Sequence, residues 1–192
     1  MTYKTSIRVV EPSSPLITDA QAKRWLHRDD DDDLEDIQLL IASAMSHLDG
    51  IDGILRRGLV SQQWSDIWSG FAAYERLPLA LAPVSAVASV SYYDDVNVLQ
   101  TMAVSEYSLH QDFSGSYLRL ASGESWPPTY ERDDAVTITY TAGYGGAQDV
   151  PAEIRVAARE LLEIWYNCVG DGTDNLPASI MTKLRRFIRP HF

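Results

Sequence analysis

The sequence predicts an α+β fold in which a helical core carries an inserted antiparallel β-rich lobe. Apolar residues recur at helical spacing near both ends, whereas the middle holds short runs of β-branched and aromatic residues separated by turn signals. A chain of 192 residues with 45% hydrophobic content suits one compact domain with a single core. We divide it into an N-terminal helical part (1–58), a β-rich lobe (59–146), and C-terminal helices with a tail (147–192).

A capping box marks the start of the first helix. The Thr18 hydroxyl and the Gln21 side chain can satisfy free amides there, which predicts a helix over about 19–28. After it, apolar residues recur at alternating intervals of three and four positions. This pattern predicts a longer helix of about six turns that ends near Gly58. This helix seam consists of Leu34, Ile37, Ile41, Ala44, Leu48, Ile51 and Leu55.

Five consecutive aspartates separate the two helices: Asp29, Asp30, Asp31, Asp32 and Asp33. Carboxylates at the N-cap and first turn accept hydrogen bonds from free amides and oppose the helix dipole, which accounts for two or three of the five. The others need another reason, because adjacent like charges repel. A metal site is disfavoured, since consecutive side chains at a helix start diverge and the run lacks the glycine of a calcium loop.

The middle of the chain predicts five or six antiparallel strands, carried by QQWSDIW, ASVSYYD, EYSLHQ, SYLRLA and AVTITYTAG. DDVN at 94–97 and FSGS at 113–116 favour turns between strands. The aromatic residues of this lobe either form a stacking platform for bases or sugars or pack in a core or subunit interface. Packing is favoured because basic residues do not interleave them. These residues are Trp64, Trp68, Tyr92, Tyr93 and Trp126.

Two further helices follow the lobe. Gly143 to Gly146 indicate a tight turn and not a dinucleotide loop, because Gln148 stands where the third glycine of that loop belongs. Pro151 in a first turn predicts the next helix, and a last helix is expected over about 178–188. The apolar face of the first of these two helices is Ile154, Ala158, Leu161, Leu162, Trp165 and Cys168.

Charge is distributed unevenly along the chain. The formal net charge of −11 argues against general binding to a phosphate backbone. The stretch from Lys183 to Phe192 nevertheless contains Lys183, Arg185, Arg186 and Arg189 and no acid. We expect these cations to be exposed, so that the tail docks on an acidic surface of a neighbour.

The sequence offers no motif for catalysis. Cys168 is the only cysteine, the four histidines lack the i, i+4 spacing of a zinc site, and no G-x-S-x-G elbow occurs. No apolar stretch is long enough to span a membrane, and the start lacks the apolar centre of a signal peptide. We therefore expect a soluble, non-enzymatic protein without cofactor or metal. A small acidic enzyme or a carbohydrate-binding module that uses the aromatic lobe remains the alternative.

The run LITDAQAKRWLHRDDDDDLEDIQLLIASAMSHLDGIDGILRRGLVSQQW resembles the opening of the head-tail connector (adaptor) proteins of tailed phages, prophages and gene transfer agents. LPLALAPVSAVASVSYYD, SWPPTYERDDAVTITYTAGYG and DVPAEIRVAARELLEIWY are similar to the family's β-lobe and next helix. The resemblance implies a ring of about twelve copies beneath the portal that joins the DNA-filled head to the tail. Stoppers and tail-completion factors, the other neck proteins, commonly lack the long capped helix pair.

The resemblance also implies partners and a location. The protein would be assembled in the host cytoplasm, reside in the virion neck, and contact the portal and a tail-side stopper or tail terminator. DNA would pass through the ring without sequence-specific binding. Asp29–Asp33 would then line the channel and repel phosphate, or receive a basic patch of a neighbouring copy. The expected portal-docking residues are Lys183, Arg185, Arg186, Phe187, Ile188, Arg189, Pro190, His191 and Phe192.

Overall fold

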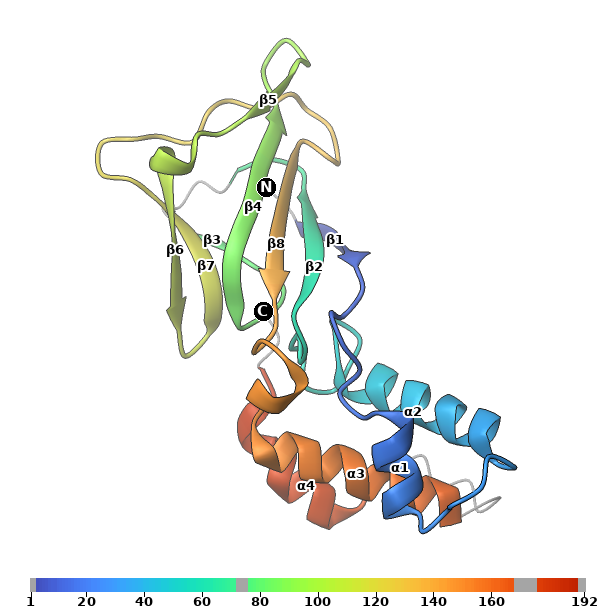
Figure 1. Cartoon of the computed structure of the whole chain (residues 1–192). Helices are drawn as coiled ribbons and strands as arrows, with labels where there is room; N and C mark the ends of the chain where they lie inside the picture. Colours follow the sequence, from blue (N-terminus) through green and yellow to red (C-terminus); the bar gives the residue numbers. More distant parts are fainter. Residues whose placement is uncertain (1–2, 72–75, 168–175, 190–192) are drawn as a thin grey trace.

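A computed structural model describes residues 3–71, 76–167 and 176–189. Within these ranges, a β-lobe of two antiparallel sheets stands on one end of a layer of four α-helices (Figure 1). The mixed architecture agrees with the predicted α+β class. Cys168 and the last three residues, Pro190, His191 and Phe192, lie outside the described residues.

The larger sheet has five strands in the order β1-β2-β8-β4-β5. These strands are β1 (Tyr3–Val10), β2 (Gln62–Trp68), β8 (Val136–Ala142), β4 (Val84–Tyr93) and β5 (Leu99–Thr101). In β2 and β8, buried residues alternate strictly with half-buried ones, which is the pattern of strands with one face in a core. The predicted strand in AVTITYTAG is therefore confirmed.

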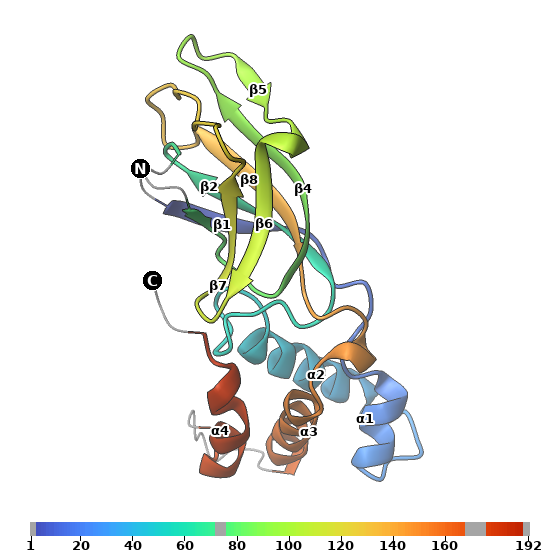
Figure 2. The same ribbon diagram turned by 90° about the vertical axis from the view of Figure 1, so that its left-hand side faces the viewer.

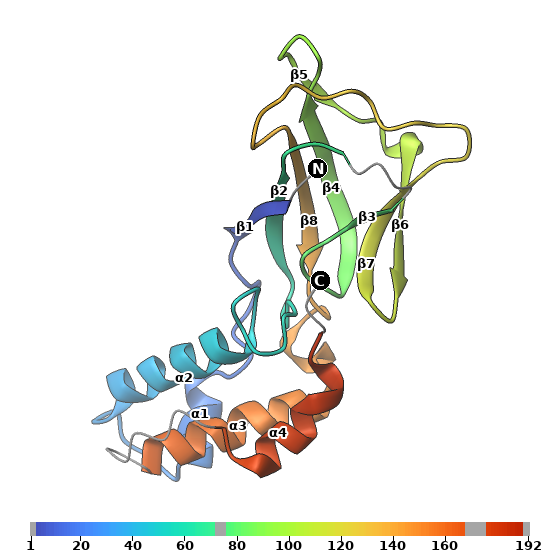
Figure 3. The same ribbon diagram turned by 180° about the vertical axis from the view of Figure 1, so that it is seen from behind.

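A smaller sheet in the order β3-β7-β6 packs over the same core (Figure 3). Its strands are β3 (Arg76–Pro78), β7 (Gly115–Leu120) and β6 (Tyr107–Asp112), and the 3-10 turn η1 (Val104–Glu106) precedes β6. Trp64 and Trp68 are buried in the hydrophobic cluster of the lobe, and Tyr92 and Trp126 pack against this cluster. Four of the five aromatic residues thus belong to a core, as the packing interpretation predicts, whereas Tyr93 lies under the Arg132 guanidinium, which is 3.6 Å from the Tyr93 ring centroid.

The helices are α1 (Asp19–Trp25), α2 (Leu34–Leu48), α3 (Ala152–Asn167) and α4 (Ala178–Leu184). The 3-10 turn η2 (Ala147–Asp149) leads into α3, and η3 (Arg185–Phe187) continues α4. The predicted capping box is present at α1, where Thr18 Oγ1 accepts from the Gln21 amide and Gln21 Oε1 accepts from the Thr18 amide. Helix α2 packs on α3, and α3 packs on α4. Helices that precede the lobe in sequence and helices that follow it therefore form one layer, and the lobe is inserted in the chain between them.

Two hydrophobic clusters occur among the described residues, where chain length predicted a single core. One cluster lies between the helices and the other between the two sheets. The helical layer meets the end of the sheets and not a sheet face (Figure 1), so the two apolar surfaces are not shared. Polar contacts of Asp49 and Arg189 join the two parts.

Strand β1 was not predicted, because residues 1–58 were expected to be helical. It lies at an edge of the large sheet and pairs only with β2, more than fifty residues away in sequence. An edge strand with a distant partner leaves little local signal. The short strands β3 and β5 were missed for a similar reason, since each has three residues.

Helix α2 ends at Leu48, ten residues before the predicted end near Gly58. Asp49 has an extended backbone and Gly50 has a φ of +85°, so the chain leaves the helix there. Leu55 is nevertheless buried in the helical cluster, and Ile51 packs against the cluster of the lobe. Apolar spacing continued past the helix because the following loop also contributes to the cores. Helix α1 similarly ends at Trp25, before the predicted residue 28.

Gly143 and Gly145, which follow β8, have φ angles of +128° and +126°. A Cβ atom on Gly143 would lie 2.6 Å from the Val60 carbonyl oxygen. This turn returns the chain from the lobe to the helices and requires glycine, which confirms the predicted tight turn.

Candidate assembly interfaces

The acidic turn, Asp29–Asp33, connects α1 to α2 at the end of the helical layer remote from the β-lobe (Figure 1). Asp33 occupies the N-cap position of α2, but its carboxylate pairs with Arg28 at 3.0 Å and accepts a hydrogen bond from the Tyr166 hydroxyl at 2.7 Å. This carboxylate makes no capping hydrogen bond, so the expectation that the N-cap and first turn account for two or three of the five aspartates is wrong. Glu35 and Asp36 in the first turn are the residues that oppose the helix dipole.

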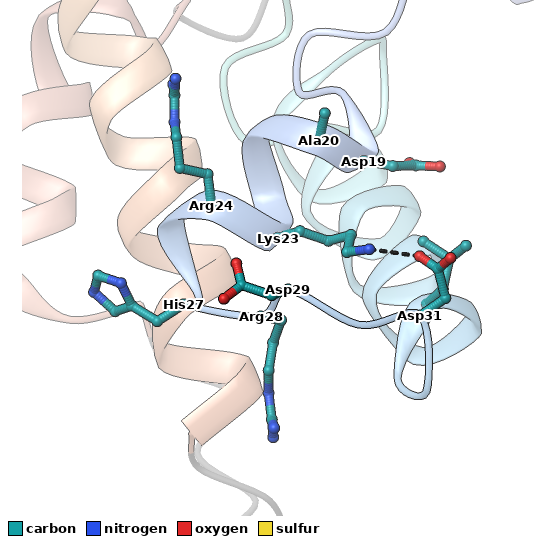
Figure 4. A pocket seen from close by; sticks show the side chains of 9 residues that line it. Asp19, Ala20, Lys23, Arg24, His27, Arg28, Asp29 and Asp31 are labelled. Carbon is teal, nitrogen blue, oxygen red and sulfur yellow. Dashed lines mark hydrogen bonds and ion pairs between the residues drawn. The ribbon is translucent and has the colours of Figure 1, made fainter.

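A hollow of about 560 Å³ borders the acidic turn (Figure 4). Lys23 reaches across it from α1 to form an ion pair with Asp31. Asp29, Asp30 and Asp32 are exposed. Two of the five aspartates thus hold the turn to its own helices, and three present charge to solvent.

The helix seam lies inside the protein. Ile37, Ile41, Leu48 and Leu55 are buried in the helical cluster, and Leu34 is half-buried. Ile37, Ile41 and Leu48 pack α2 on the other helices of the same chain, so they do not offer a surface to another copy. Leu55 reaches the same cluster from the loop that follows α2.

Two cations of the C-terminal segment, Lys183–Arg189, are paired with acids on α3. Lys183 Nζ donates to both oxygens of Glu160 at 2.5 and 2.6 Å, and Arg186 pairs with Glu153. Arg185 is exposed. The segment is therefore docked on α3, and Arg185 and Arg186 are its accessible cations.

Arg189 is only 4% exposed, so the expectation that it is a surface cation is wrong. Its guanidinium donates to three backbone carbonyls of the lobe: Ser114 at 2.9 Å, Ala80 at 2.7 Å and Leu79 at 2.9 Å. Burial lowers the pKa of Arg189. A planar guanidinium with several fixed donors suits such a cluster of acceptors.

The position of Arg189 depends on Gly115. This glycine has a φ of +134°, and a Cβ atom there would lie 2.2 Å from Arg189 Nη2. The hairpin between β6 and β7 therefore leaves a space that the arginine fills. The sequence motif FSGS predicted a turn here but gave no sign of the arginine that occupies it.

Asp66 lies in the same polar network. It is fully buried, and its carboxylate accepts from the Ser6 hydroxyl, the Tyr140 hydroxyl at 2.9 Å and the Ala80 amide at 2.7 Å. Burial raises the pKa of Asp66, while these hydrogen bonds and the charge of Arg189 oppose the rise. Ala80 thus links the two buried charged groups, since its amide binds one and its carbonyl binds the other.

A second polar contact joins the end of α2 to the large sheet. The buried Asp49 carboxylate accepts from the Leu59 amide at 2.7 Å, from Gln62 Nε2 at 2.9 and 3.0 Å, and from Arg8 Nη2 at 2.9 Å. Burial raises the pKa of Asp49, and the hydrogen bonds from Gln62 and Leu59 lower it. The helical layer is therefore fastened to both β1 and β2.

Sequence reasoning did not identify the exposed apolar and cationic surfaces of the lobe. Phe113, at the tip of the β6–β7 hairpin, is 95% exposed. Arg76 and Arg119 lie directly opposite each other on β3 and β7, and Arg76 also covers the Tyr117 ring. The signal that could have identified Phe113 as exposed is its place in the turn motif FSGS, because a turn at the tip of a hairpin faces solvent. The facing arginines have no local signal, because they are 43 positions apart.

Within residues 3–71, 76–167 and 176–189, no three histidine, cysteine, aspartate or glutamate side chains are placed to hold a metal ion. No helix in the same ranges is long and apolar enough to cross a membrane.

No protein-family model and no curated protein matches the chain. Solved structures do match. A chain in the neck of an empty gene transfer agent particle, computed with C6 symmetry, has a TM-score of 0.80 and 17% identity, covering 98% of this chain and 97% of that one. Chains in the neck of the native particle, computed with C12 symmetry, and in its virion each have a TM-score of 0.74, 18% identity and the same coverage. This chain therefore has the fold of these neck proteins along its whole length.

Proposed function

We propose that this protein is a head-tail connector: a non-enzymatic virion protein that forms a ring beneath the portal, joins the DNA-filled head to the tail and extends the DNA channel. The observation that carries the proposal is the fold shared with gene transfer agent neck proteins over 98% of the chain. The C6 and C12 symmetry of those structures supports a ring, for which we propose about twelve copies.

The C-terminal segment is the proposed contact with the portal. Arg185 is exposed and Arg186 lies at the surface of α3, so both can meet an acidic surface. Arg189 instead holds the segment to the lobe and so sets the place from which the last residues continue. A tail-side neck protein would bind the opposite end of the ring.

A carbohydrate-binding or enzymatic role has less support. The aromatic residues that would form a stacking platform are used within the protein: Trp64 and Trp68 are 6% and 7% exposed. Both belong to the hydrophobic cluster of the lobe, and the Arg8 guanidinium lies over the Trp64 ring, so their burial stabilises the lobe.

Deletion of the gene tests the proposed function. An in-frame deletion in the strain that produces the particle should yield DNA-containing or leaking heads separated from tails, because the joint between portal and tail is lost. Electron microscopy of particles and an assay of packaged DNA would show this, and supplying the gene in trans should restore tailed particles. Normal tailed particles in the deletion strain would refute the connector proposal.

The exposed part of the acidic turn supports a second prediction. Replacing Asp29, Asp30 and Asp32 with asparagine removes three charges and keeps the ion pairs of Asp31 and Asp33. Stability should change by less than about 0.5 kcal/mol, because exposed charges contribute little. DNA ejection should slow if the turn faces the channel, and the ring should dissociate more readily if the turn faces a neighbour.

The matched control neutralises three other exposed acids, Asp95, Glu124 and Glu131, all in the lobe. Ejection kinetics by DNA release and ring integrity by sedimentation are to be measured for both triple variants. Wild-type behaviour of the acidic-turn variant in both assays would leave local ion pairing as the whole role of these aspartates.

A further inference from the structure

The tip of the β6–β7 hairpin presents an aromatic side chain to solvent. Phe113 is 95% exposed, the largest value among the exposed apolar side chains of the described residues. Exposing a whole phenyl ring to water is unfavourable, and aromatic side chains that enter a partner's pocket dominate the energy of many interfaces.

The tip is held in one conformation. Asp112 Oδ1 accepts from the Ser114 amide at 2.8 Å, and Asp112 pairs with Gly115 at the end of the hairpin. The Ser114 carbonyl in turn accepts from Arg189 Nε at 2.9 Å. Hydrogen bonds therefore fix the residues on both sides of Phe113, which reduces the entropy lost when the ring is bound.

The same contacts bring the C-terminal segment to the hairpin. Arg189 binds the residue that directly follows Phe113, although they are 75 positions apart in sequence. Figure 2 shows α4 rising toward the lower end of β6 and β7. A partner that receives the C-terminal segment consequently meets the hairpin tip as well.

We propose that Phe113 and the C-terminal segment form one docking surface, in which the ring of Phe113 enters an apolar pocket of the same partner that receives the segment. Arg189 is the positioning residue that holds the two elements together. This inference rests on the proposed function, which makes the portal ring the partner. We expect the matching portal surface to carry an apolar pocket beside acidic groups, because the segment that Arg189 joins to the hairpin also carries the exposed cations Arg185 and Arg186.

The experiment measures binding of the full-length protein to purified portal rings of the same particle. Phe113→Ala should weaken binding at least tenfold, and Phe113→Tyr should retain it within about threefold. The matched control is Val104→Ala, which truncates a side chain that is 74% exposed at the opposite end of β6 and should change binding less than twofold. Arg185→Glu should also weaken binding.

The positioning role of Arg189 predicts non-additive effects. In an Arg189→Lys background, Phe113→Ala should cost much less binding than in the wild-type background, because the loosened tip no longer presents the ring in one place. If Phe113→Ala weakened binding by the same factor in both backgrounds, Arg189 would act on the fold alone and would not position the ring.

The outcomes separate the inference from the function on which it rests. Wild-type binding by Phe113→Ala, with weakened binding by Arg185→Glu, would overturn the inference and leave the connector proposal intact. Loss of ring formation without loss of portal binding would also overturn it, since another copy of the chain would then be the partner. Failure of the wild-type protein to bind portal rings would count against the proposed function itself.

Discussion

Arg189→Glu should lower the free energy of unfolding by about 3–5 kcal/mol, the range for removing one partner from a buried charged network. The change removes three hydrogen bonds to lobe carbonyls and leaves those acceptors buried. It also places a carboxylate near the buried Asp66, whose negative charge Arg189 stabilises. The sequence had predicted an exposed cation at this position, where a substitution would change stability little.

Chemical denaturation followed by tryptophan fluorescence would measure the effect, because Trp64 and Trp68 lie in the lobe core. The matched control is Arg185→Glu on the exposed side of the same segment, for which a change below about 0.5 kcal/mol is expected. Arg189→Lys should be intermediate, since an ammonium keeps the charge but lacks the planar fork. Equal stability of Arg189→Glu and Arg185→Glu would contradict the structural role of the buried guanidinium.

Asp49→Ala should be the second strongly destabilising change, by about 3 kcal/mol, because it leaves buried donors from Leu59 and Gln62 without an acceptor. It also removes the ion pair with Arg8 on β1. For a chain of this length, such a loss lowers the midpoint of thermal unfolding by roughly 6–12 °C.

Circular dichroism during heating would test this prediction. Asp52→Ala is the control, because Asp52 is an exposed aspartate three residues away in the same loop. Asp49→Asn should lose less than Asp49→Ala, since the amide oxygen still accepts one or two of the hydrogen bonds. A loss of about 1 kcal/mol would already lower the midpoint by roughly 2 °C or more. A midpoint for Asp49→Ala within about 2 °C of wild type would therefore refute the role of Asp49 in joining the helical layer to the sheet.

Patterns that depend on neighbouring residues were predictable from the sequence. The capping box at Thr18 and Gln21 is set within four residues, and the alternation in β8 and the glycines of the following turn can be read directly from the local sequence. In such cases, local backbone and side-chain chemistry determines the structure, so the sequence pattern is sufficient.

Predictions failed where a side chain serves a distant part of the chain. The local pattern of Arg189 is that of a surface cation, yet its partners lie 75 to 110 positions away. The end of α2 is set by Asp49, whose carboxylate binds Leu59, Gln62 and Arg8. Asp33 likewise binds Tyr166 of α3 instead of its own helix. Charge and periodicity along one segment carry no information about such contacts.

The polar junction between the helical layer and the β-lobe has a mechanical consequence. Hydrogen bonds weaken steeply when their geometry changes. Asp49 and Arg189 fasten the lobe at two separate points, one to β1 and β2 and one to the β6–β7 hairpin. These two contacts thus fix the orientation of the β-lobe relative to the helical layer. A force that pulls on the lobe is transmitted to the helices through these hydrogen bonds.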